Sequence, residues 1–163
     1  MKAIKLMLIA FCLGISTLAI SQEKGDKLKQ MIKNQDYNFI AQTALPQSGS
    51  SVYLTSEYDF KVTPTEIVSY LPFYGRAYTA PMNPNEGGIK FTSSNFKYTE
   101  KYNKKKGKWD ITIVPNDYKE VSSVNISITE SGYASLSVNS YQRSGISFSG
   151  YIAENKKKEK GGK

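Results

Sequence analysis

The sequence predicts a mainly β domain, a single antiparallel meander closed or nearly closed into a barrel of about eight or nine strands. From Tyr37 onward, apolar and polar residues alternate with the period of two that is typical of half-buried strands. Short turns separate these stretches, and sequential strands joined by turns favour a meander. A meander of this size must close or fold over, because exposed edges invite aggregation. A two-sheet β-sandwich is the alternative.

The chain begins with the layout of a secretory signal peptide, which we place at residues 1–21. Two early lysines precede an apolar run from Leu6 to Ile20. The small residues Ala19 and Ser21 stand at positions −3 and −1 of a predicted cleavage site before Gln22. The apolar run is shorter than the roughly 20 residues that a retained membrane anchor needs. We therefore expect an exported protein, periplasmic or extracellular, with no integral membrane segment after cleavage.

The amino-acid composition excludes several kinds of active site and metal site. The chain has no histidine, so it lacks the usual general base and the commonest metal ligand, and a Ser-His-Asp triad is excluded. Its single cysteine, Cys12, lies in the predicted leader, so the mature domain has no disulfide. Lipidation of Cys12 is the alternative, and the bulky Phe11 before it argues against this. We expect no cofactor, no metal site and no enzymatic activity.

The mature chain is expected to have three parts. Residues 22–36 form an N-terminal helical segment, because Leu28, Met31 and Ile32 fall at helical spacing and give one narrow apolar stripe. Residues 37–153 form the β-barrel domain. Residues 154–163 form a disordered basic tail, since this stretch carries five lysines and no apolar side chain that could pack.

The strands of the barrel follow from the alternating stretches. In chain order they are expected at Tyr37–Leu45, Val52–Val62, Glu66–Leu71, Ile89–Phe91, Phe96–Asn103, Lys108–Val114, Val124–Ile128, Tyr133–Ser140 and Ile146–Ile152. Gly150 stands where an inward side chain would crowd a corner of the barrel.

The longest irregular stretch, Pro72–Gly88, holds the sharpest candidate for a binding site, because long loops in compact domains are often functional. The planar guanidinium of Arg76 suits a carboxylate or phosphate, and the aromatic rings around it suit the apolar part of a ligand. The ligand-binding residues of this hypothesis are Tyr70, Phe73, Tyr74, Arg76 and Tyr78. Alternatively, the rings cap an open end of the barrel and Arg76 pairs with a local acid.

A second candidate is a basic cluster at the turn near position 105. It consists of Lys104, Lys105, Lys106 and Lys108, and with the basic tail it could bind polyanions. The alternative is a solvated hairpin tip, with Trp109 in the core. No specific nucleic acid is expected as a partner. A hydrolase built on carboxylates is disfavoured, because Glu57 and Asp59 alternate with apolar residues and should face solvent.

Several blocks of the chain resemble an exported bacterial family catalogued as domain of unknown function 4251. They are NFIAQTALPQSG (Asn38–Gly49), SYLPFYGRAYTAP (Ser69–Pro81), GGIKFTSSNFKYTE (Gly87–Glu100), KKGKWDITI (Lys105–Ile113) and GISFSGYI (Gly145–Ile152). The resemblance implies a lipocalin-like β-barrel exported by Gram-negative bacteria, and it supplies no activity or catalytic residue. We expect an exported, non-enzymatic binding or envelope-accessory domain whose partner is an unknown small molecule or envelope component.

Overall fold

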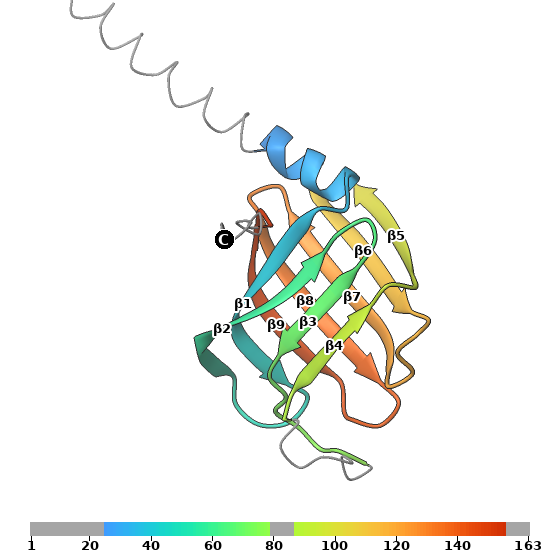
Figure 1. Ribbon diagram of the computed structural model, residues 1–163. Coiled ribbons are helices and arrows are strands. Elements are labelled where there is room, and N and C mark those ends of the chain that lie inside the picture. Colours follow the sequence, from blue (N-terminus) through green and yellow to red (C-terminus); the bar gives the residue numbers. More distant parts are fainter. Residues whose placement is uncertain (1–24, 79–86, 156–163) are drawn as a thin grey trace, which may run out of the picture.

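The computed structural model describes residues 25–78 and 87–155, and it confirms the predicted mainly β fold (Figure 1). Within these residues the chain forms nine strands and one short helix. The strands are β1 (Tyr37–Pro46), β2 (Val52–Val62), β3 (Ile67–Leu71), β4 (Ile89–Ser93), β5 (Phe96–Asn103), β6 (Lys108–Pro115), β7 (Val121–Thr129), β8 (Tyr133–Ser140) and β9 (Ile146–Ala153). The predicted bounds need correction mainly at β4 and β7. The strand β4 runs two residues further, and β7 begins three residues earlier.

All nine strands join one antiparallel sheet in the order β4-β3-β2-β1-β9-β8-β7-β6-β5. Only the pairing of β1 with β9 departs from chain order, and it brings the first and last strands together. The sheet curls into a nearly closed barrel rather than a two-sheet sandwich (Figure 1). Its two edge strands, β4 and β5, are consecutive in the chain, so the short turn at Ser94 and Asn95 crosses the seam.

The core of the barrel is filled by the inward residues that the alternation predicts. Large aromatic and branched side chains from both halves of the sheet are fully buried. They include Tyr37, Phe39, Phe60, Phe148, Ile111, Ile126 and Leu136. Trp109 is also buried, as expected for a residue on the apolar face of β6. Close packing of this kind supplies most of the free energy that stabilises a domain without disulfides.

The N-terminal helix covers one end of the barrel, where β1 begins (Figure 1). It occupies residues 25–33 of the predicted 22–36 segment, and residues 22–24 lie outside the described part. Leu28 and Ile32 are buried against the barrel core, and Met31 packs beside them. No helix in the described ranges is long and apolar enough to cross a membrane.

A pair of tyrosine hydroxyls lies in the barrel and joins β1 to β5. The hydroxyl oxygens of Tyr37 and Tyr98 are 3.3 Å apart, within hydrogen-bond distance. Burial raises the pKa of the Tyr98 hydroxyl to about 12, and burial also raises the pKa of Tyr37 well above its ordinary value. Both groups are therefore neutral at physiological pH, and their contact helps to hold the edge strand β5 to the centre of the sheet.

The seam between β4 and β5 is held by Asp117, in the turn that joins β6 to β7. The Asp117 carboxylate accepts hydrogen bonds from the backbone amides of Ser94 and Asn95, at 2.9 and 3.1 Å, and from the Ser93 hydroxyl. Beside it, the rings of Phe91 and Tyr118 stack with their centroids 4.6 Å apart. These contacts tie the β4 edge to the β6–β7 turn across the gap in the sheet.

The Asp117 contacts predict a pH-dependent contribution to stability. The hydrogen bond from Ser93, followed by those from the backbone, lowers the pKa of the Asp117 carboxyl. A lowered pKa in the folded state means that the contribution is present above the unfolded pKa, about 3.9, and is lost as the pH falls through the folded value. We therefore expect the Asp117→Asn variant to melt below the wild type at pH 7 and to approach it below about pH 4. An equal gap in melting temperature at both pH values would contradict this assignment.

Gly150 lies at a point where two strands approach too closely for a side chain. A Cβ atom at this position would stand 1.9 Å from the carbonyl oxygen of Ile40 in β1. The contact adjoins a β-bulge in β1, where the register shifts between Ala41 and Thr43 in the pairings with both β2 and β9. The crowding that the sequence predicts for Gly150 is therefore confirmed, and its cause is the backbone of the neighbouring strand.

Candidate functional site

The first part of the predicted binding loop is fastened to the turn between β8 and β9. Ala77 forms an isolated antiparallel bridge with Arg143. The amide of Tyr78 donates to the carbonyl of Gln142 at 2.8 Å, and the amide of Ser144 donates to the carbonyl of Arg76 at 2.9 Å. Residues 72–78 are therefore a braced segment at the end of the barrel opposite the helix, and residues 79–86 lie outside the described part.

The structure separates the five residues of the predicted ligand site. Tyr70 stacks on Tyr58 at 5.6 Å between centroids and receives the Lys90 ammonium at 4.8 Å, so it belongs to the surface of the sheet. Phe73 is half-buried and packs against the core. Tyr74, Arg76 and Tyr78 are exposed.

Three of the predicted residues are exposed on residues 72–78. The neighbouring β8–β9 turn adds one more exposed aromatic residue, Tyr141. We call the exposed set Tyr74, Arg76, Tyr78 and Tyr141 the tyrosine–arginine rim. Within the described residues, no ion pair engages the Arg76 guanidinium. The alternative expectation is that the rings cap the barrel. Of the rings in residues 72–78, only that of Phe73 packs against the core.

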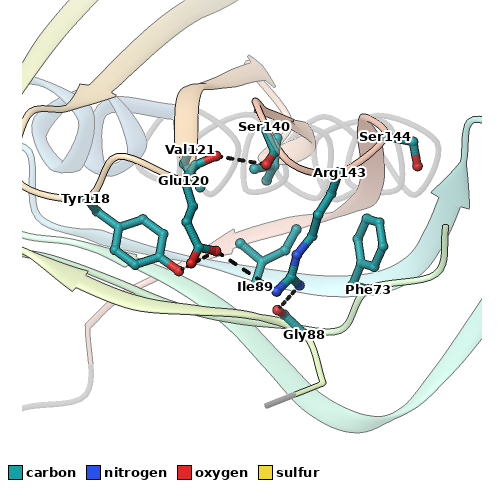
Figure 2. Close-up of a pocket in the computed structure, with 10 residues that line it drawn as sticks. Phe73, Gly88, Ile89, Tyr118, Glu120, Val121, Ser140, Arg143 and Ser144 are labelled. Carbon is teal, nitrogen blue, oxygen red and sulfur yellow. Dashed lines mark hydrogen bonds and ion pairs between the residues drawn. The ribbon is translucent and has the colours of Figure 1, made fainter. Parts of the chain in front are cut away.

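Arg143, which the sequence did not single out, is the arginine that the fold encloses (Figure 2). Its side chain is 17% exposed, and its guanidinium donates to the carbonyl oxygen of Gly88 at 2.6 Å. The guanidinium also lies 5.3 Å from the centroid of the Phe73 ring and 4.0 Å from a carboxylate oxygen of Glu120. Phe73 and Gly88 stand near the two ends of the long loop, so Arg143 ties both ends to the β8–β9 turn.

The space around Arg143 is too small for a ligand. Phe73, Ile89, Tyr118, Val121 and Val138 close it together with Arg143, and its volume is about 10 Å³. A cavity needs roughly 10 to 15 Å³ of such volume to hold one water molecule. Around Arg143, the described residues therefore leave room for no more than about one water molecule.

The predicted basic cluster is only partly brought together. Lys104, Lys105 and Lys106 are exposed in the β5–β6 hairpin. Lys108 instead lies on the outer face of the sheet, where its ammonium donates to the Asp110 carboxylate at 2.8 Å and to the Ser127 hydroxyl at 3.0 Å. The hydrogen bond from Lys108 lowers the pKa of Asp110. This ion pair offsets the charge of Lys108.

Metal-ligating side chains are not gathered in the described part of the chain. No group of three or more histidine, cysteine, aspartate or glutamate residues there has the geometry to hold an ion. Glu57, one of the carboxylates considered for hydrolysis, is exposed. The other, Asp59, accepts a hydrogen bond from the Asn38 side chain at 2.8 Å, which is a contact between neighbouring strands.

The fold and the loop end define an antiparallel β-barrel domain with a core of buried apolar side chains and an exposed rim of aromatic and basic side chains. The chain belongs to the family described as Domain of unknown function (DUF4251), whose sequence pattern matches residues 19–152. This agrees with the resemblance that the sequence blocks indicate.

A solved structure supports the fold. The crystal structure of a DUF4251 family protein from Bacteroides eggerthii DSM 20697 is similar to this chain with a TM-score of 0.58 and 14% sequence identity. The similarity covers 80% of this chain and 87% of that one. At this identity the likeness shows the shared fold and carries no information about a ligand. No curated protein matches the chain.

Proposed function

We propose that the protein is an exported, non-enzymatic binding domain that uses the tyrosine–arginine rim to hold an anionic group of a bacterial envelope component. The observation that carries this proposal is an exposed, braced segment bearing Arg76 and its aromatic neighbours, beside an enclosed space of only about 10 Å³ around Arg143. A guanidinium without a partner in the described residues is available to a carboxylate or phosphate, and flanking rings add apolar contact area.

The bracing supports binding because it reduces the entropy that a loop loses when it captures a partner. The bridge at Ala77 and the paired backbone groups of Arg76 and Tyr78 already fix the segment on the β8–β9 turn. A preorganised surface of this kind binds more tightly than a free loop with the same side chains.

A site-specific crosslinking experiment tests the proposal. A photoreactive phenylalanine analogue would replace Tyr78, and in a control Lys33, which is exposed on the helix at the other end of the barrel. Irradiation of native host cells should give a discrete adduct from position 78 and none from position 33. Adding Arg76→Ala to the position-78 protein should lower the adduct yield at least fivefold. An equal yield from both positions, or no adduct from position 78, would refute the proposal.

Export makes a separate prediction. The protein recovered from the envelope or medium of its host should begin at Gln22 and carry no lipid, because the leader has a cleavage site there and Cys12 is removed with it. Intact-mass spectrometry of the native protein measures this directly. A retained leader would contradict cleavage before Gln22, and an added acyl mass would contradict the absence of a lipid.

A further inference from the structure

The outer face of β7 to β9 is an uncharged surface of short hydroxyl side chains with tyrosines at one side. Because Ala134, Leu136 and Phe148 point into the core, the residues that alternate with them point outward. In one row across neighbouring strands, Ser127 stands opposite Ser135, and Ser135 opposite Ser149. Tyr133 and Tyr151 face one another in the next row of outward residues on β8 and β9.

The β-bulge in β1 adds an amide group to this face. Ala41 pairs with Gly150 and Thr43 pairs with Ser149, so Gln42 is an extra residue that has no partner on β9. Its exposed side chain lines a shallow hollow of about 330 Å³ together with Tyr133, Ser135 and Ser149. Bulges commonly redirect a side chain beside a functional site. Here Gly150 lets the bulged strand come close enough to place Gln42 in the hollow.

The polar side chains in the hollow differ in whether they already form hydrogen bonds within the protein. At its β6–β7 side, the Ser127 hydroxyl donates to Asp110 at 3.0 Å and accepts from Lys108. By contrast, the side chains of Gln42, Ser135 and Ser149 form no hydrogen bond with any described residue. The hollow therefore presents hydroxyl groups that both donate and accept, and an amide that does the same, next to an aromatic ring.

We propose that this hollow binds a neutral glycan. A pyranose ring has an apolar face of C–H groups, which packs on an aromatic ring, and a rim of hydroxyls, which pairs with uncharged donors and acceptors. Tyr133, which is 68% exposed, supplies the ring, while Gln42, Ser135 and Ser149 supply the polar groups. No charged residue lines the hollow, and the Lys108 ammonium that donates to Ser127 at its side is already paired with Asp110.

The surface continues far enough for more than one sugar unit. A second hollow, of about 350 Å³, shares Ser127 and Ser135 with the first and extends along Ser137 and Ser147. In this second hollow the one charged residue, Asp110, is paired with Lys108. The proposed site therefore suits a chain of neutral sugars that crosses the strands. It uses residues separate from the tyrosine–arginine rim and goes beyond the function proposed above.

Affinity electrophoresis tests the site directly. The mature chain from Gln22 to Lys163 would run in acidic native gels that contain dextran, laminarin, arabinoxylan or galactomannan. At least one of these neutral polymers should retard the protein. The variants Tyr133→Ala and Gln42→Ala should each lower the affinity for that polymer, the first at least tenfold. Their melting temperatures should stay within about 2 °C of the wild type, because both side chains are exposed.

The matched control is Tyr141→Ala. Tyr141 is 75% exposed and follows the other end of β8, about 25 Å along the strand from Tyr133. This variant should bind as the wild type does. If Tyr141→Ala loses binding and Tyr133→Ala keeps it, the glycan sits on the tyrosine–arginine rim and this inference is overturned. It is equally overturned if none of the four polymers retards the protein, or if Tyr133→Ala binds like the wild type.

Discussion

Replacing Gly150 with alanine is expected to lower the free energy of unfolding by about 3 kcal/mol or more. The added Cβ atom would stand 1.9 Å from the carbonyl oxygen of Ile40, and the contact is with backbone rather than with a flexible side chain. The only relief is to move β1 away from β9, and this pairing joins the first strand of the barrel to the last. At roughly 3 °C per kcal/mol, the melting temperature should fall by about 10 °C.

Gly145→Ala is the control for this prediction. Gly145 precedes β9 in the same hairpin, and a Cβ atom there would make only ordinary contacts, the nearest at 3.7 Å. Thermal melting should therefore separate the two variants clearly. A Gly150→Ala protein as stable as Gly145→Ala would mean that β1 and β9 are not in the close approach described. Where Gly150→Ala still folds, the displaced bulge should also weaken glycan binding, because Gln42 belongs to the same bulge.

The strands and the core of this protein were predictable because local patterns determine them. Each inward residue of β6 to β9 alternates with a polar neighbour, so the period of two marks both the strand and its buried face. The helix was predictable for the same reason, since Leu28 and Ile32 share one face. Strand ends were less accurate. The β7 strand starts at Val121, within a polar stretch whose pairing with β8 is not visible in the sequence.

The roles of the two arginines could not be predicted, because they depend on contacts between distant segments. Arg76 stands in an aromatic-rich motif that predicts either a ligand-binding residue or a local ion pair, and its side chain is exposed. Arg143 stands in a polar turn with no marked pattern, and it is enclosed because Gly88 and Phe73 reach it from another part of the chain. Nothing in the local sequence around Arg143 indicates these partners.

The hydroxyl-rich face of β7 to β9 could not be predicted either, because it also depends on contacts between distant segments. Alternating serines on β8 and β9 predict a solvated side of each strand, and this is correct for each strand alone. The rows across the sheet depend on the register of four pairings, and the position of Gln42 depends on the bulge in β1. A one-residue slip in any pairing would break the rows. The candidate glycan site is therefore a property of the assembled sheet.

Replacing Arg143 with alanine is expected to cost about 2 kcal/mol of stability, because the change strands a backbone acceptor and opens the packing around Phe73. The guanidinium donates to the Gly88 carbonyl at 2.6 Å and covers the Phe73 ring, so its loss releases both ends of the long loop. The contribution of Glu120 is small, since its nearest oxygen is 4.0 Å away and the carboxylate is 43% exposed. Glu120→Gln should therefore change the melting temperature much less than Arg143→Ala.

Arg76→Ala is the matched control, because it removes an arginine from the partner strand of the same bridge. Its side chain is exposed, so the loss of stability should stay below about 0.5 kcal/mol. Chemical denaturation of the two variants measures the difference, and proteolysis of the loop between Phe73 and Gly88 should become faster in Arg143→Ala alone. The opposite order of stabilities would place Arg76 in the scaffold and remove it from the proposed binding surface. With the expected order, Arg143 supports the loop from within the fold, and Arg76 remains available for a partner without being needed for folding.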